Sequence, residues 1–417
     1  MAWIDHAIFW HVYPLGFAGV DIRGDQEAHP GNPGEAHPGD PGEAHPGNPG
    51  EAHPGKNGKA EGLKQLEQSL DYLIRLGCNG LLLGPIFRSH THGYDTIDHF
   101  GIDPRLGTEE DFDALAAACN EKGIALVLDG VFSHVGEGFV RPELIGEGVF
   151  EGHGDLKRLN HADPACQAYV AEVMQYWCAR GVRGWRLDAA YSMENSFWAE
   201  VLPKVRQEHA DVWILGEVIH GDYPAIIAES GMDSLTQYEL WKAIWSGLND
   251  ANFFELEWSV RRHMEFLEHF IPNTFVGNHD VTRIASKVGQ DKAVLAAVLL
   301  LTMPGIPSIY YGDELGMEGI KEERIGGDDA VRPEWKPEWV EGDEPAVLGV
   351  WKSLIALRRQ HSWLVNATVE TLELENEHYV YRVQQRGGQE RLEVELSLSP
   401  SPRAIIRNAN AEVIWQR

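Results

Sequence analysis

Residues 184–190 read Gly184-Trp185-Arg186-Leu187-Asp188-Ala189-Ala190, the pattern of a short buried strand that ends in an acid. Because side chains alternate along a strand, Arg186 and Asp188 are predicted to lie on the same face. A guanidinium in that position can hold a carboxylate ionised and fix its orientation. A structural ion pair at a strand end would have the same pattern, so this stretch alone leaves both interpretations open.

Three further stretches have the same form, an apolar run that ends in an acid. They are Leu126 to Asp129, with His134 five residues on; Val212 to Glu217; and Thr274 to Asp280, in which His279 precedes the acid. If all four runs are parallel strands, their acids gather at one rim of a sheet. Such crowding is costly unless the site works on protons or cations. The four stretches together therefore predict a functional site.

Strand and helix patterns alternate along most of the chain. The predicted strands cover 7–15, 79–85, 124–131, the runs ending at Asp188 and Glu217, 232–237, 273–277 and 308–311. Thr108 and Asp163 have the form of helix N-caps, and a long helical stretch is expected over 238–270. Eight strand–helix units with acids at the strand ends predict a (β/α)8 TIM barrel, an α/β fold, over residues 1–361.

Two segments interrupt or extend this barrel pattern. Residues 135–160, rich in glycine and charge, predict a short inserted segment after the third strand. Residues 362–417 alternate apolar and polar side chains in places, which predicts a small C-terminal antiparallel β domain.

Residues 27–58 form an unusual repeat after the first predicted strand. An eight-residue unit, Glu-Ala-His-Pro-Gly-Asn-Pro-Gly in its first copy, begins again at Glu35, Glu43 and Glu51. Proline and glycine make up half of each intact unit, and large apolar residues are missing, so the repeat cannot build a core. We expect a turn-rich or polyproline-like loop; metal binding by its evenly spaced histidines is the alternative.

Composition limits the classes of partner. The chain has 417 residues with 64 acidic against 35 basic side chains, a net charge of −29. Such a charge argues against binding to nucleic acid or to an anionic membrane, and it is compatible with a neutral substrate such as a sugar. With no signal-peptide pattern, no apolar run of membrane length and four cysteines without metal-ligand spacing, we expect a cytoplasmic protein, and we favour a monomer.

With these residues in view, the sequence resembles the alpha-amylase family of glycoside hydrolases. DGVFSH (129–134), GWRLDAAY (184–191), LGEV (215–218) and FVGNHD (275–280) match its four signature regions, and HGYD (92–95) and MPGIPSIYYGDE (303–314) are supporting matches. The resemblance covers roughly residues 7–361. The wording of the second and third regions is most similar to the cyclomaltodextrinase and neopullulanase branch.

The resemblance implies roles for individual residues. Asp188 would be the nucleophile of a retaining hydrolysis, Glu217 the acid/base and Asp280 the transition-state stabiliser, with the carboxyl groups of the first two about 5–5.5 Å apart. The implied substrate-binding or orienting residues are Tyr94, Asp95, Asp129, His134, Arg186, His279, Asp329 and Arg332. The residues themselves agree in one respect: Glu217 has no basic neighbour in sequence, which suits an acid whose pKa should rise.

Two departures from the family pattern concern calcium. Ser133 stands where the family usually has an asparagine ligand, and the 135–160 segment is short, so we expect no bound metal and no other cofactor. The predicted function is hydrolysis of α-1,4-glucosidic bonds in malto-oligosaccharides or related α-glucans. A transglycosylase or a glucosyl-sugar isomerase of the same family would use the same carboxylates and stays open. A catalytically inactive binding module would be marked by loss of a catalytic acid.

Overall fold

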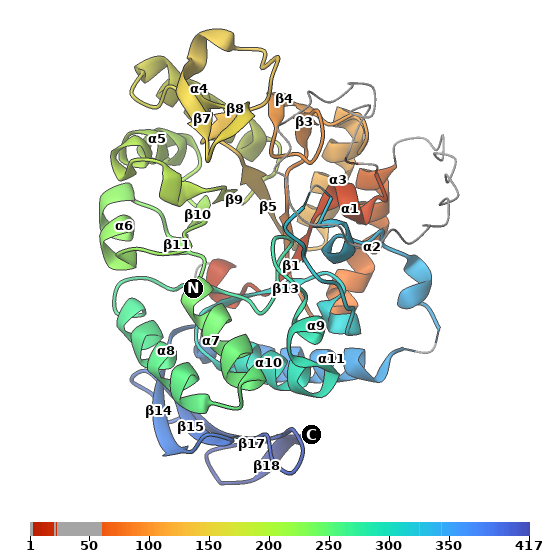
Figure 1. The fold of residues 1–417 in the computed structure, drawn as a ribbon, viewed down its shortest axis with the longest axis vertical. Helices are drawn as coiled ribbons and strands as arrows, with labels where there is room; N and C mark the ends of the chain where they lie inside the picture. Colours follow the sequence, from red (N-terminus) through yellow and green to blue (C-terminus); the bar gives the residue numbers. More distant parts are fainter. Residues whose placement is uncertain (1–2, 21, 23–60, 325, 343) are drawn as a thin grey trace, which may run out of the picture.

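The computed structural model describes residues 3–20, 22, 61–324, 326–342 and 344–417 (Figure 1). The repeat at 27–58, for which we expected a loop, lies outside these residues. Within the described residues, no helix is both long enough and apolar enough to cross a membrane.

Within the described part of the chain, eight parallel strands form a barrel in the order β11-β10-β9-β5-β2-β1-β13-β12. The strands are β1 (Phe9–Val12), β2 (Gly80–Leu83), β5 (Ala125–Gly130), β9 (Gly184–Leu187), β10 (Trp213–Gly216), β11 (Ser234–Leu235), β12 (Asn273–Thr274) and β13 (Ile306–Tyr310). A bridge between Thr236 and Asn273 joins the two ends of this order and closes the ring. The predicted TIM barrel is confirmed, with strands shorter than the sequence runs suggested.

Helices surround the barrel strands (Figure 1). They are α1 (Pro14–Phe17), α2 (Gly62–Leu76), α3 (Glu109–Glu121), α4 (Pro164–Ala179), α5 (Asn195–Glu208), α6 (Tyr223–Ser230), α7 (Tyr238–Asn249), α8 (Phe253–Phe266), α9 (Ile284–Val288), α10 (Gln290–Thr302) and α11 (Ala346–Gln360). The predicted caps are confirmed: Thr108 and Asp111 form a reciprocal capping box on α3, and the Asp163 carboxylate caps α4.

The expectation of one helical stretch over 238–270 is wrong. The chain breaks between α7 and α8, where Ala251 has a positive φ of 51° and the Asn252 side chain accepts a hydrogen bond from the Phe254 N–H. The Phe253 N–H donates to the Asn376 carbonyl, so the start of α8 is also tied to the C-terminal sheet. A positive φ cannot continue an α-helix, and the Asn252 side chain instead starts a new one.

The interior of the barrel is layered. Phe9, Val127, Leu215 and Ile306 belong to one apolar cluster inside the ring of strands. Two residues further along each strand, the inward positions are His11, Asp129, Glu217 and Ser308, all buried. An apolar floor thus supports a polar layer at the C-terminal ends of the strands.

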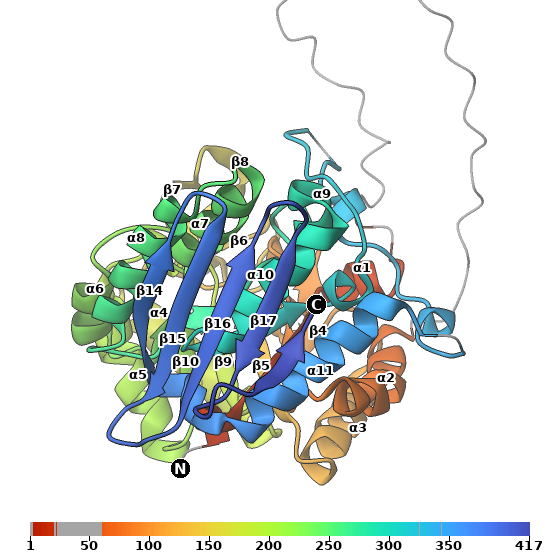
Figure 2. The ribbon, with the colours of Figure 1, turned by 90° about the horizontal axis from the view of Figure 1, so that it is seen from below.

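Three smaller β units accompany the barrel in the described part of the chain. The segment after β5 folds into a three-stranded antiparallel sheet of β6 (His134–Val135), β7 (Ile145–Phe150) and β8 (His153–Leu159). The short hairpin β3 (Phe87–Ser89) and β4 (Thr96–Ile102) follows β2. The C-terminal sheet of β14 (Ala367–Leu374), β15 (His378–Gln385), β16 (Arg391–Ser397), β17 (Arg403–Arg407) and β18 (Val413–Gln416) is antiparallel and contacts α8 and α10 (Figure 2). The expected short inserted segment and small C-terminal β domain are confirmed.

Candidate active site

Arg186 contacts three of the acids at the strand ends. Its Nη1 is 2.6 Å from Asp129 Oδ2 and 3.3 Å from Asp188 Oδ1, and its Nη2 is 2.6 Å from Glu217 Oε1. The register explains the meeting, because Arg186 pairs with Asp129 on β5 and with Leu215 on β10, two residues before Glu217. One buried guanidinium therefore serves three carboxylates from three adjacent strands.

Glu217 is held by neutral donors as well. The Ala189 N–H donates to its Oε2 over 3.0 Å, and the Tyr238 hydroxyl donates to its Oε1 over 3.1 Å. Ala189 has a positive φ of 46°, a conformation unusual for alanine, and this turn directs its N–H at Glu217. The Asn278 amide donates to the Tyr238 oxygen over 2.9 Å, so Tyr238 must give its own proton to Glu217.

The pKa of Asp188 shifts in the direction opposite to our expectation. Burial, and then the charge of Glu217, raise the pKa of Asp188 well above its ordinary value against the opposing effect of Arg186. Burial likewise raises the pKa of Asp129 although Arg186 binds both its oxygens. Burial outweighs the charge of the single cation Arg186 at both Asp188 and Asp129. Glu217 has no basic neighbour in sequence, but Arg186 reaches it from the neighbouring strand.

Asp280 is the most exposed of the four acids, with a side chain 32% accessible. Its Oδ1 is 2.9 Å from Arg332 Nη2, and its Oδ2 is 3.0 Å from His279 Nε2. Burial opposes ionisation, but the charges of His279 and Arg332 hold the pKa of Asp280 well below its ordinary value. Asp280 is therefore the acid that stays charged, while Asp188 favours a proton.

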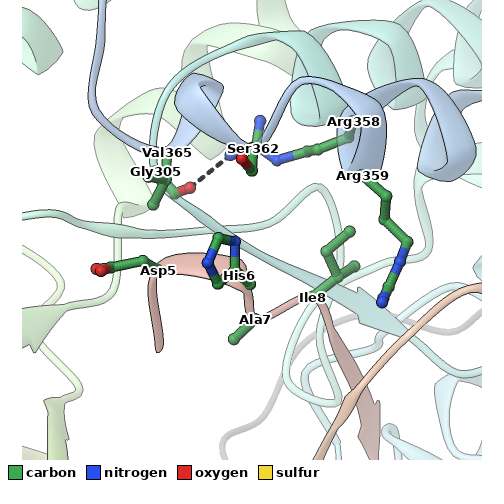
Figure 3. Close-up of a pocket in the computed structure, with 9 residues that line it drawn as sticks. All are labelled: Asp5, His6, Ala7, Ile8, Gly305, Arg358, Arg359, Ser362 and Val365. Atoms are coloured by element: carbon green, nitrogen blue, oxygen red, sulfur yellow. Dashed lines mark hydrogen bonds between the residues drawn. The ribbon is translucent and has the colours of Figure 1, made fainter. Parts of the chain in front are cut away.

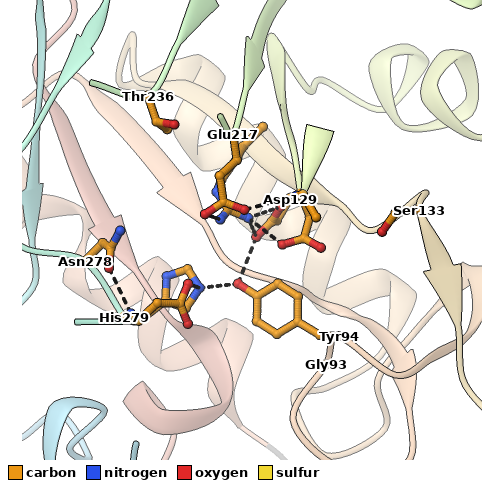
Figure 4. A network of polar contacts seen from close by, with 12 residues as sticks. Gly93, Tyr94, Asp129, Ser133, Glu217, Thr236, Asn278 and His279 are labelled. Atoms are coloured by element: carbon orange, nitrogen blue, oxygen red, sulfur yellow. Dashed lines mark hydrogen bonds and ion pairs between the residues drawn. The ribbon is translucent and has the colours of Figure 1, made fainter. Parts of the chain in front are cut away.

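His279 is fully buried beside two tyrosine rings. Tyr13 stacks on it at a centroid distance of 5.6 Å and within 10° of parallel. Tyr94 lies nearly in the plane of the His279 ring and meets its edge through the hydroxyl. The Tyr94 hydroxyl hydrogen-bonds His279 Nε2 and lies 3.2 Å from Asp129 Oδ2 (Figure 4). Tyr94 thus links the Asp280 side of the site to the acids around Arg186.

His134 and Asp95 lie beside Tyr94 and are engaged with the protein. His134 Nε2 contacts the Tyr94 carbonyl at 2.9 Å, and its ring stacks on Phe150 of the inserted sheet at 4.2 Å. Burial lowers the pKa of His134 to about 4, so this ring is neutral. Asp95 Oδ2 accepts two 2.8 Å hydrogen bonds from Thr91, and its Oδ1 is buried with no hydrogen-bond partner among the described residues. Both residues support the loop that carries Tyr94.

Of the two site residues predicted in the loop after β13, Arg332 contacts one of the catalytic acids directly. Arg332 binds Asp280 and donates from Nε to the His279 carbonyl over 2.9 Å. Asp329 begins the short helix Asp329–Val331, and it is Asp328 whose carboxylate lies 3.1 Å from Arg332.

Four site residues were missed from the sequence: His11, Tyr13, Tyr238 and Asn278. His11 and Tyr13 lie at the end of the first strand, and Asn278 lies inside a stretch we had singled out, so strand-end position was a usable signal for these three. Tyr238 begins α7, and its meeting with Glu217 had no signal in the sequence.

The residues at the family's calcium position do not fit a cation site. The buried Ser133 hydroxyl is 2.7 Å from His134 Nδ1, to which it donates because His134 Nε2–H faces the Tyr94 carbonyl. In the described ranges, no group of three or more His, Cys, Asp or Glu is placed to hold a metal ion.

A hollow of about 140 Å³ lies at the end of the barrel opposite to the four acids, beside the start of β1 (Figure 3). Arg358 lines it and is buried, but its guanidinium donates to the carbonyls of Leu301, Met303 and Gly305, which end α10. Arg358 thus caps a helix there, and the four acids lie at the opposite end of the strands.

Comparisons with known proteins agree with this geometry. The family model described as "Alpha amylase, catalytic domain" matches residues 12–141 and 150–344. The chain is 32% identical over 348 residues to a maltogenic alpha-amylase of Bacillus acidopullulyticus, covering 73% of this chain and 56% of that protein. It is also 32% identical over 360 residues to a cyclomaltodextrinase of Geobacillus thermopakistaniensis, covering 76% and 59%. The chain thus spans a little over half the length of these curated relatives.

Solved structures share the fold. A cyclic alpha-maltosyl-(1→6)-maltose hydrolase from Arthrobacter globiformis superposes with a TM-score of 0.77 at 23% identity, covering 98% of this chain and 97% of that chain. A cyclomaltodextrinase structure gives a TM-score of 0.76 at 25% identity, covering 95% and 70%. The catalytic-domain model, matched over most of the chain, shows that the chain belongs to the alpha-amylase family of glycoside hydrolases.

Proposed function

We propose that the chain is a retaining α-glycosidase that hydrolyses α-1,4-glucosidic bonds in malto-oligosaccharides or related α-glucans. The observation that carries the proposal is the sharing of Arg186 by Asp188 and Glu217, at the ends of adjacent strands. Retention needs one ionised and one protonated carboxyl group at the scissile bond. Two coupled acids beside a single cation hold one proton between them.

In the first step, Asp188 attacks the anomeric carbon and forms a glycosyl ester while the glycosidic bond breaks. Glu217 gives its proton to the departing oxygen. In the second step, water attacks the same carbon, the ester bond to Asp188 breaks, and Glu217 takes the proton of the water. Burial and the charge of Glu217 raise the pKa of Asp188 in the free site, so Asp188 must release its proton before it attacks.

Asp280 supplies the permanent negative charge in this scheme. His279 and Arg332 keep it ionised, so it can stabilise an oxocarbenium-like transition state throughout the reaction. Tyr94, partly exposed and hydrogen-bonded to His279, offers an aromatic ring to the sugar. We assign no step to a metal ion or another cofactor.

The substrate class rests on the relatives' names, which are maltogenic alpha-amylase, cyclomaltodextrinase and, at 28% identity, neopullulanase 2 of Thermoactinomyces vulgaris. A monomeric state and a cytoplasmic location are part of the proposal. The latter is supported by a 28% identical relative named intracellular maltogenic amylase, from Bacillus subtilis.

The test is product analysis with maltotriose, maltoheptaose, cyclodextrins, starch and pullulan, by chromatography and by proton NMR of the first anomer formed. We expect shorter malto-oligosaccharides released as α-anomers. Release of the β-anomer, or no cleavage of any of these substrates, would refute the proposal. A matched reaction with excess glucose as acceptor measures transglycosylation, and transfer exceeding hydrolysis without added acceptor would replace hydrolase by transferase.

A further inference from the structure

His11 lies directly beneath the catalytic acids and has no role in the scheme above. It is on β1 in the polar layer of the barrel interior, with 5% of its surface accessible. Its Nε2 is 3.3 Å from His279 Nδ1, and the two rings meet edge to face at a centroid distance of 5.1 Å. Tyr310 of β13 packs against the ring at 5.4 Å. His11 is thus held against the inner nitrogen of His279.

The hydrogen bonds around His279 fix which of its nitrogens carries a proton. Nε2 faces Asp280 Oδ2, and an ionised carboxylate only accepts, so Nε2 is the N–H. The Tyr94 hydroxyl donates to Asp129, so it accepts from Nε2 as well. His279 Nδ1 faces His11 Nε2, and one of these two nitrogens donates to the other. Burial lowers the pKa of His11 well below its ordinary value, which keeps its ring neutral with one N–H and one acceptor nitrogen.

Contacts at the ring edge hold the in-plane orientation of His279. Tyr13 stacks on the ring and restrains its tilting. The edge contacts lie on opposite sides of the ring: Asp280 and the Tyr94 hydroxyl at Nε2, and His11 at Nδ1. Without His11, Nδ1 would be a buried nitrogen lacking its hydrogen-bond partner, and rotation to relieve this would carry Nε2 away from Asp280.

From this edge contact we infer that His11 is a positioning residue, which fixes the in-plane orientation of His279 and through it the aim of Asp280. The inference deepens the proposed function and rests on it. His11 itself touches neither substrate nor the reacting carboxyl groups.

The test compares His11→Gln with His11→Leu. A glutamine amide can place a donor near the position of His11 Nε2, whereas leucine fills similar space without one. We expect kcat for maltotriose to fall about ten- to a hundredfold in His11→Leu, the effect of one unpaired buried nitrogen, with KM changed less than about threefold. His11→Gln should stay within about fivefold of the wild type. Phe9→Leu, on the same strand one layer below, is the control for a general loss of packing.

Two further measurements separate positioning from stability and from the proposed function. In a His279→Asn background, adding His11→Leu should lower kcat by less than about twofold further. The reason is that the effects of coupled residues are not additive. The ring nitrogens of His279, followed by NMR after ¹⁵N-histidine labelling, should show protonated Nε2 with a hydrogen-bonded Nδ1 in the wild type, and loss of the Nδ1 bond in His11→Leu.

Equal kcat in the leucine and glutamine variants, full additivity with His279→Asn, or an unchanged Nδ1 signal would overturn the role of His11. A wild-type protein that cleaves no glucan would instead overturn the proposed function. The NMR result then still decides whether His11 holds His279 Nδ1 in a hydrogen bond.

Discussion

Replacing Arg186 by methionine should separate its role as a counter-ion from its contribution to packing. Methionine is of similar length and apolar, so the variant keeps most of the packing and loses only the charge and its hydrogen bonds. In the native site this charge lies within 3.3 Å of Asp129, Asp188 and Glu217, and 3% of the residue is exposed. The variant therefore leaves three buried carboxyl groups without their cation.

The magnitude follows from burial and chain length. Breaking a buried ion pair from one side costs about 3–5 kcal/mol. The unfolding entropy of a chain of 417 residues is about 0.9 kcal/mol per kelvin, so the melting temperature should fall by about 3–6 °C at pH 8. Loss of Arg186 raises the already raised pKa values of Asp129 and Asp188 further. An acid whose pKa is higher in the folded state makes the protein less stable as pH rises. The fall in melting temperature caused by Arg186→Met should therefore be smaller at pH 5 than at pH 8.

Thermal melting of both proteins at pH 5 and pH 8, followed by circular dichroism, measures this difference. Each unit of extra pKa shift corresponds to 1.36 kcal/mol, so the two deficits should differ by at least about 1.5 °C. Arg75→Met, which removes one exposed arginine from α2, is the control for the change in net charge. Equal deficits at the two pH values would refute the assignment of Arg186 as the counter-ion of these acids.

Three further predictions use other parts of the structure. Asp188→Asn should lose more than about a thousandfold in kcat while its melting temperature stays within a few degrees, because the side chains are nearly isosteric; near-normal turnover would rule out Asp188 as nucleophile. Chelation with EDTA should change neither melting temperature nor activity, since the Ser133 hydroxyl is engaged with His134; a drop of several degrees that calcium restores would reveal a cation site. Burial raises the pKa of Glu314 from 4.5 to about 7, so its contribution to stability, about 3 kcal/mol, is present below pH 4.5 and is lost as pH rises through 7. Urea unfolding between pH 4.5 and 8 should show that the free energy of unfolding depends less on pH in Glu314→Gln than in the wild type. Parallel pH dependences in the two proteins would contradict the raised pKa of Glu314.

Strand ends and helix caps were predictable because each depends on neighbours in the sequence. The alternation that puts Arg186 and Asp188 on one face is a property of any strand, and Thr108 with Asp111 is a local hydrogen-bond pair. The acids at four strand ends followed from the same local reasoning, and the barrel followed from their repetition.

The rest depends on contacts between strands and helices far apart in the chain. Arg186 meets Glu217 only through the register of β9 with β10, and Tyr238 meets Glu217 only because α7 begins at the closing strand of the barrel. The raised pKa of Asp188 is a consequence of that geometry, since burial and the charge of Glu217 outweigh the opposing charge of the adjacent Arg186. The break at Ala251 depends in the same way on a backbone contact with Asn376.

The most direct test of the account is the identity of the residue that forms the covalent intermediate. Incubation with 5-fluoro-α-D-glucosyl fluoride, which forms the glycosyl ester and slows its hydrolysis, should label the active protein once per chain. Peptide mass spectrometry should then place the sugar on Asp188, and Asp188→Asn should take up none. A label on Asp129, Glu217 or Asp280, or an active protein that never accumulates a label and releases β-anomeric product, would contradict the account.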